Sequence, residues 1–234
     1  MHSNKYTFMY SIGLSILTAI VLVFTSEILK PQQEFNLALD QKTNILKSLL
    51  IYDKSAQEVE KIYSSQIEEI VVNGEGEIVN GEKPSGLVMK EEVAKPVKDR
   101  KLPVYIFKNS DGSKNYVVPL YGVGLWGPVW GFLSFEKDLN TVKGAYFDHK
   151  GETPGLGAEI AEKPFQSQFI GKKIKDEKNN FVSVNVLKTT VKSPLAAEHR
   201  VDAISGGTLT SDGTNNMIKN SVEGYLKYFE KIKE

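Results

Sequence analysis

The sequence has no cysteine, and its 29 basic residues are balanced by 29 acidic ones. Without cysteine the chain cannot form disulfides, ligate an iron–sulfur cluster through thiolates or use a thiolate nucleophile, and this fits an extracytoplasmic location. The balanced charge provides no field that would attract nucleic acid, so nucleic-acid binding is disfavoured. At 234 residues, 41% of them hydrophobic, the chain is long enough for one sizeable domain with appendages. Any redox role would therefore require a bound cofactor.

Metal-binding and hydrolytic motifs are also missing. The three histidines, His2, His149 and His199, have no metal-ligand spacing to one another, so no metal is assigned. Ser205 could pair with His149 or His199 in a hydrolase, but residues 203–207 do not form the Gly-x-Ser-x-Gly nucleophile elbow. The spacing therefore gives no support to a catalytic triad.

A run of 21 uncharged residues, 6–26, lies between Lys5 and Glu27 near the N-terminus. As a helix it would cover roughly 30 Å, the thickness of a bilayer core. A cleaved signal peptide is the alternative, but no clear small-x-small cleavage site follows the apolar segment. We therefore expect residues 6–29 to form a single uncleaved transmembrane helix. A weak positive-inside bias from Lys5 and the terminal amine favours residues 1–5 in the cytoplasm.

Residues 30–101 are expected to form a helical stalk and an exposed insertion. Pro31 suits the first turn of a second helix, and apolar residues recur at helical spacing over residues 35–51, which predicts a stalk that docks one face. Residues 55–58, Ser-Ala-Gln-Glu, fit a capping box that opens a further helix. Residues 74–101 are rich in Gly, Glu, Lys and Pro, so we expect short strands at most and no chemistry there.

Residues 102–234 carry the pattern of the main domain. A turn signal, Asn-Ser-Asp-Gly at residues 109–112, predicts a hairpin between the strands on either side. Helical patterns precede and follow the strands, so the predicted class is α+β: one transmembrane helix, then a largely antiparallel sheet with flanking helices. The β-rich runs lie at residues 70–72, 103–107, 116–120, 129–135, 142–147 and 181–187.

The most chemically loaded segment is a glycine-centred, hydroxyl-rich loop at residues 201–211, which leads into a predicted helix at residues 212–229. Two adjacent glycines let backbone N–H groups turn toward one point, and the helix N-terminus adds free donors and a partial positive charge. This is anion-binding geometry and suits a phosphate. Walker A and dinucleotide loops do not fit, since the required Lys and third glycine are absent. The alternative is an ordinary turn in which Ser211 or Asp212 caps the helix.

Two other glycine-rich stretches could contact a ligand. Residues 120–128 place Tyr121 and Trp126 among three glycines, where Trp126 could stack on a flat ring. A buried tryptophan at a sheet bend is the alternative. Residues 151–157, Gly-Glu-Thr-Pro-Gly-Leu-Gly, would ordinarily be a turn into a helix at residues 158–161.

These three stretches resemble motifs of the FMN-binding domain family. Residues 202–210, Asp-x-x-Ser-Gly-Gly-Thr-x-Thr, resemble the flavinylation motif, with Gly207 where most members have alanine. Residues 152–157 match the signature Glu-Thr-Pro-Gly-Leu-Gly, and residues 122–126 resemble the element Gly-x-Gly-Leu-Trp. Together with the predicted anchor, they make nearly the whole chain similar to the C subunits of sodium-translocating NADH:quinone reductases.

The resemblance implies FMN as cofactor, joined through its phosphate to Thr208 by a flavin transferase. Thr210 is the alternative acceptor. Glu152 and Thr153 are implied to supply polar contacts, and the residues from Leu156 to Gly157 to pack near the flavin ring. The full set of implied cofactor-binding residues is Thr208, Ser205, Gly206, Gly207, Leu209, Thr210, Glu152, Thr153, Gly155, Leu156, Gly157 and Trp126.

The resemblance also implies a setting and partners. The chain would be a single-pass protein of the cell inner membrane with its domain in the periplasm. It would pass electrons among the other subunits of a complex that oxidises NADH, reduces ubiquinone and exports sodium. No NADH-binding fingerprint occurs in this chain, so substrate turnover would belong to the assembled complex.

Two alternatives remain at the level of sequence. One is the G subunit of a ferredoxin-linked Rnf complex, which shares the flavin loop. The other is a single-pass extracytoplasmic sensor or scaffold without flavin, in which the glycine loops are only structural.

Overall fold

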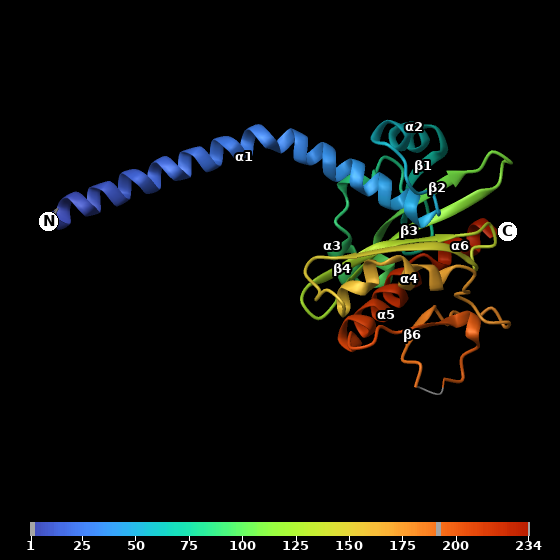
Figure 1. Cartoon of the computed structure of the whole chain (residues 1–234). Helices are drawn as coiled ribbons and strands as arrows, with labels where there is room; N and C mark the ends of the chain where they lie inside the picture. The colour runs from blue at the N-terminus through green and yellow to red at the C-terminus, as the bar shows by residue number, and fades with distance from the viewer. Residues whose placement is uncertain (1–2, 191–192, 234) are drawn as a thin grey trace. The chain divides into compact units, whose positions relative to one another are not determined.

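The computed structural model describes residues 3–190 and 193–233, and the chain divides into two units, one up to Gln41 and one from Lys42 onward. Helix α1, Asn4–Ser48, makes up nearly all of the first unit and continues into the second (Figure 1). It contains an exposed stretch of mean hydropathy 2.2, long and apolar enough to cross a membrane, as a signal sequence also is. Of the predicted cytoplasmic residues 1–5, the first two lie outside the described residues.

Helix α1 runs through Pro31 without ending, so the prediction of a second helix starting there is wrong. The fixed φ of proline is itself helical, and its presence removes one backbone hydrogen bond and crowds the preceding turn. No glycine occurs between Gly13 and Gly74 to favour a break. The residues around Pro31 are therefore able to continue the helix at the cost of that one bond.

The end of α1 packs against strands of the second unit, as expected for a stalk that docks one face. Ile45 and Leu46 are buried, and the Ser48 carbonyl oxygen accepts a hydrogen bond from Ser134 Oγ at 2.6 Å. Gly144 permits this approach, because a Cβ there would lie 2.4 Å from the Ser48 carbonyl oxygen. The junction is therefore shaped by backbone as well as by side chains.

We expect Gly144→Val to destabilise the second unit by roughly 1–3 kcal/mol, the usual cost of overpacking a filled site. The added carbons would meet the Ser48 backbone, which cannot rotate aside as a flexible side chain can. Thermal unfolding of the detergent-solubilised chain, followed by circular dichroism, measures the change. Gly86→Val is the matched control, because a Cβ at Gly86 meets nothing within 4 Å. Equal losses in the two variants would contradict this explanation.

The second unit is built on a five-stranded antiparallel sheet in the order β1-β2-β3-β4-β5. The predicted hairpin connects β2 and β3, and in its turn the Gly112 N–H donates to the Asn109 carbonyl oxygen. The predicted α+β class, with an antiparallel sheet and flanking helices, is confirmed. The strands are β1 (Ile67–Asn73), β2 (Lys101–Lys108), β3 (Lys114–Val123), β4 (Pro128–Phe135) and β5 (Val142–His149).

Both faces of the sheet are covered (Figure 1). Helix α5, Thr208–Glu223, packs along β3, whereas α2, Ala56–Gln66, packs on β1 and β2. Helix α2 opens with the predicted capping box, in which Ser55 and Glu58 satisfy each other's backbone N–H groups. Because both faces are buried, β2 reads as a near-continuous apolar run rather than an alternating one.

Most residues of the segment 74–100 are exposed, and the segment nevertheless has a regular structure. It contains short helices rather than strands, and the buried Arg100 guanidinium donates to the carbonyl oxygens of Lys95 and Asn220. The sequence pattern did not indicate these helices, because each has only three to six residues, too few for a helical periodicity to show. They are η1 (Pro84–Gly86), α3 (Met89–Ala94) and η2 (Val97–Asp99).

The elements after β5 are short, except for the C-terminal helices. The strand expected at residues 181–187 reduces to β6, Asn185–Leu187, which pairs in parallel with β7, Arg200–Asp202. The helix expected at residues 212–229 begins earlier, as α5, and is followed by α6, Leu226–Lys233. The other elements are η3 (Gly157–Ala161), α4 (Lys163–Gln166), η4 (Ser167–Phe169) and η5 (Ala197–His199).

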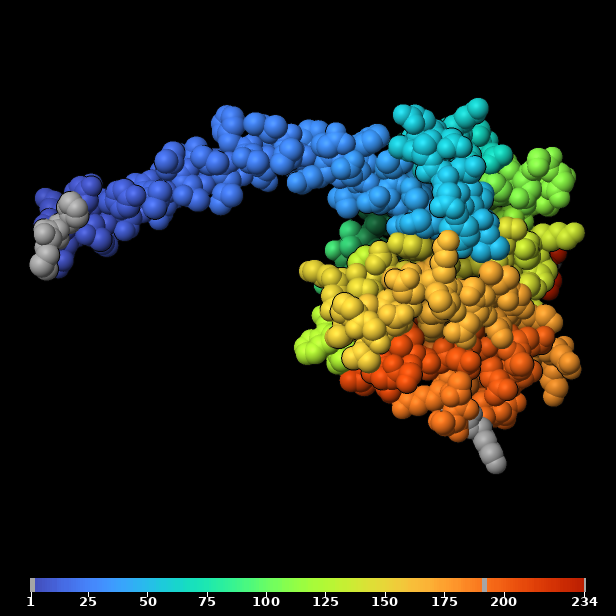
Figure 2. Space-filling view, in the orientation of Figure 1, coloured from blue at the N-terminus to red at the C-terminus, as the bar shows by residue number. Residues whose placement is uncertain are grey.

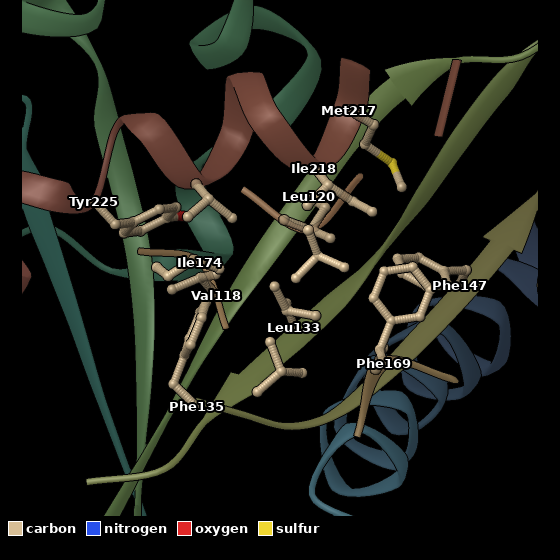
Figure 3. Close-up of a cluster of buried hydrophobic side chains, with 14 of the residues drawn as sticks. Val118, Leu120, Leu133, Phe135, Phe147, Phe169, Ile174, Met217, Ile218 and Tyr225 are labelled. Carbon is tan, nitrogen blue, oxygen red and sulfur yellow. The ribbon is translucent and has the colours of Figure 1, made fainter. Parts of the chain in front are cut away.

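The main hydrophobic core lies between the sheet and α5. Figure 3 shows side chains from β3, β4 and β5 meeting those of the C-terminal helices. Aromatic rings pack edge to face at its ends, with Phe147 and Phe169 centroids 5.0 Å apart. The residues labelled in the figure are Val118, Leu120, Leu133, Phe135, Phe147, Phe169, Ile174, Met217, Ile218 and Tyr225. This core fixes the N-terminal end of α5 relative to the ends of β3 and β5.

Candidate functional site

Three loops meet at the start of α5. One connects β3 to β4, one follows β5, and the third leads into α5 and includes its first turn, from Thr208 to Thr210. In Figure 2 the yellow chain near residue 150 lies against the orange-red chain beyond residue 200. The loops enclose a small cavity of about 140 Å³ lined by Leu125, Glu152, Thr153, Leu156, Gly157, Gly206, Gly207, Thr208, Leu209 and Thr210.

The α5 end of the cavity has the geometry of an anion site. Gly206 has φ 75°, a left-handed conformation that favours glycine, and Thr208 is the first helical residue. The N–H groups of a helix's first turn have no partners within the helix, and the helix dipole places partial positive charge there. Neither Ser211 nor Asp212 caps this helix, because α5 begins at Thr208 and both residues lie inside it; the Ser211 Oγ accepts from the Ile204 N–H at 3.1 Å. The capping alternative is therefore wrong.

Glu152 links all three loops through one buried carboxylate. The side chain is only 4% exposed. Its Oε1 accepts from the Trp126 backbone N–H at 2.8 Å, and its Oε2 accepts from Thr210 Oγ1 at 2.5 Å. The positive end of the α5 dipole helps to offset the desolvation of this charge. Glu152 therefore holds the loop after β5 against both of its neighbours.

Two glycines leave room for that carboxylate. A Cβ at Gly157 would lie 2.4 Å from Thr210 Oγ1 and 2.5 Å from Glu152 Oε2. A Cβ at Gly124 would lie 2.5 Å from Glu152 Oε1. Larger residues at either position would displace the hydrogen-bonded group, so these glycines are required by close approach.

Exposed apolar side chains surround the cavity. Leu125, Leu156 and Leu209 line it and are also exposed to solvent, and Trp126 follows Leu125 directly. Trp126 is 68% exposed, so the alternative of a buried tryptophan at a sheet bend is wrong. Exposed apolar residues gathered from three loops are typical of a surface that receives an apolar ligand or partner.

Comparison with known proteins identifies the family. A family model of the FMN-binding domain matches residues 124–223. The C subunit of the Na(+)-translocating NADH-quinone reductase of Pasteurella multocida is 35% identical over 247 residues, covering 97% of this chain and 94% of its own. The equivalent protein of Vibrio vulnificus is 32% identical and covers 92% and 89%, respectively. The chain belongs to this family of C subunits.

Crystal structures of two relatives in this family have the same fold. The protein from Parabacteroides distasonis aligns with a TM-score of 0.77 at 40% identity, over 86% of this chain and 96% of its own. Shewanella oneidensis NqrC aligns with a TM-score of 0.68 at 26% identity, over 83% and 96%. Both the predicted resemblance to the C subunits and the predicted fold are therefore confirmed, and the relatives are named as parts of an oxidoreductase.

The residues singled out by the family motifs occupy different places at the site. Ten residues line the cavity, and nine of these were among the candidates; Leu125, inside the quoted Gly-x-Gly-Leu-Trp element, was not named. Ser205, Gly155 and Trp126 do not line it: Ser205 and Trp126 are exposed, and Gly155 supplies a turn at φ 73°. Leu125 could have been found from its position beside Trp126.

Proposed function

We propose that this chain is the FMN-carrying C subunit of a sodium-translocating NADH:quinone reductase. The observation that carries the proposal is the convergence of three family motifs on one cavity, at the N-terminal end of α5. The residues fit FMN at both ends of the cofactor: free helix N–H groups suit the phosphate, and exposed apolar side chains suit the flat ring. FMN supplies the redox chemistry when it is bound, and the protein supplies position and electrostatics.

We propose Thr208 as the residue that carries the cofactor through a phosphoester. Thr208 is partly exposed, lines the cavity and begins α5. The Thr210 hydroxyl is buried and donates its hydrogen to Glu152. Attachment at Thr210 would remove that hydrogen and leave the Glu152 carboxylate facing an ester oxygen. These contacts support Thr208 as acceptor and give Thr210 a supporting role.

A phosphoester fixes only one end of FMN, so a second group of residues must orient the ring. Trp126, Leu156 and Leu209 are exposed apolar side chains from the three loops, and they support a ring position beside the cavity. Glu152 fixes the loops that carry the first two. In this role Glu152 acts on the ring through the backbone it holds.

The proposed role is to relay electrons between other subunits of the complex. The chain has no fingerprint for NADH, so its contribution is a flavin held at a defined place. Defined placement matters because electron transfer depends on the distance to the next carrier. Attachment would be made by a separate flavin transferase, which is the second expected partner.

The experiment is expression with and without a flavin transferase, followed by denaturation and dialysis. We expect flavin fluorescence to remain with the unfolded chain only when the transferase is present. Flavin lost into the dialysate from every sample would contradict covalent attachment. A chain that never acquires flavin under these conditions would favour the sensor or scaffold alternative.

We also propose that α1 anchors the chain in the inner membrane, with everything beyond it on the periplasmic side. Because the chain has no native cysteine, its orientation can be tested by labelling single introduced cysteines. We expect Lys83→Cys to react with an impermeant maleimide in spheroplasts, since residue 83 is exposed beyond the helix. Asn4→Cys, at the other end of α1, should react only after lysis. The opposite pattern would reverse the orientation.

A further inference from the structure

Strand β5 ends at His149, an imidazole that the proposed flavin site does not use. Its Nδ1 accepts a hydrogen bond from the Glu152 backbone N–H at 3.2 Å. An accepting ring nitrogen carries no hydrogen, so the hydrogen of the neutral ring is on Nε2. The local structure thus requires one tautomer of His149.

The hydrogen bond from the Glu152 N–H to His149 matters because the carboxylate of the same residue connects the loops of the site. The Glu152 carboxylate joins Trp126 and Thr210, as described above, and has little room to move between Gly124 and Gly157. A shift of the Glu152 backbone would therefore move the carboxylate away from both donors. Two residues before Glu152, the Lys150 N–H donates to the Pro128 carbonyl oxygen of β4 at 3.0 Å.

We propose that His149 is a positioning residue for this site: its unprotonated Nδ1 holds the Glu152 backbone and thereby fixes the carboxylate that joins the three loops. The effect on a flavin rests on the proposed function. The effect on the loop does not, because the hydrogen bond is a property of the chain itself.

The test compares His149→Asn with His149→Phe in the full chain expressed without a flavin transferase, so that no flavin is attached whichever threonine is the acceptor. Asparagine keeps an accepting oxygen near the place of Nδ1, whereas phenylalanine keeps the ring and loses the acceptor. Hydrogen–deuterium exchange of residues 150–157 is followed by mass spectrometry. We expect about tenfold faster exchange in the Phe variant, the size of one lost hydrogen bond, and wild-type exchange in the Asn variant.

The flavin absorption spectrum supplies the second readout. In chains that carry flavin, the Phe variant should change this spectrum and the Asn variant should keep it. Exchange in the Phe variant equal to that with His149, or in the Asn variant as fast as in the Phe variant, would overturn the proposal. Absence of flavin from all chains would contradict the proposed function and leave the exchange result valid.

Discussion

Replacing Thr208 by alanine is expected to abolish covalent FMN while leaving the fold intact. The change removes the proposed acceptor oxygen and one methyl group from a partly exposed position at the start of α5. Surface changes of this kind usually alter stability by no more than about 0.5 kcal/mol. Flavin fluorescence of the denatured chain, after expression with the transferase, should fall to background, and thermal unfolding should hardly move.

Two control variants make this result specific. Thr208→Ser keeps a hydroxyl and should retain FMN. Thr210→Ala should also retain FMN but unfold more easily, because it leaves the buried Glu152 carboxylate with one donor fewer. Loss of FMN in Thr210→Ala with retention in Thr208→Ala would exchange the roles of the two threonines.

The largest effect on stability is expected from Glu152→Ala. It removes a buried carboxylate that accepts from the Trp126 N–H and from Thr210 Oγ1, and leaves both donors without it. An unsatisfied buried polar group costs about 1–3 kcal/mol, so for two donors we expect a loss of about 2–6 kcal/mol. Urea unfolding of the solubilised chain, with the transition of the second unit analysed by itself, measures this.

Glu152→Gln is the matched variant. Its amide has one accepting oxygen and is close to the carboxylate in shape, so one of the two hydrogen bonds can persist. Its stability should lie between those of the original chain and the Ala variant. If Ala and Gln both unfold at the original urea concentration, the carboxylate does not hold the three loops together.

The sequence predicted most of the fold because its signals are local. Strands β2 to β5 are marked by β-rich runs, and the hairpin turn by Asn109 to Gly112. Helix α2 is marked by the capping box at Ser55. The predicted helix boundary at Pro31 failed because it depends on the relative energies of continuing and ending the helix, which a local pattern does not record. Pro31 was expected to start a helix, yet it lies inside one with helical residues on both sides.

The candidate site was predicted by motif rather than by geometry. Sequence spacing cannot reveal that Glu152 and Thr210, 58 residues apart, share a hydrogen bond. Nor could it show that α5 begins at Thr208 rather than near Asp212, because Gly207, the residue before the helix, has no side chain that could mark its start. The role of His149 had no sequence signal at all, since a lone histidine after a strand has many ordinary explanations. These features emerge only when the loops are brought together by the sheet.

The central claim, that Thr208 carries FMN, is tested most directly by peptide mass spectrometry. Trypsin cleaves after Arg200 and after Lys219, the next basic residue, and should therefore release residues 201–219. From chain expressed with the transferase, we expect this peptide to gain the mass of FMN less one water, and fragment ions to place the addition on Thr208. Recovery of the peptide entirely unmodified, or with the addition on Thr210, would contradict the account.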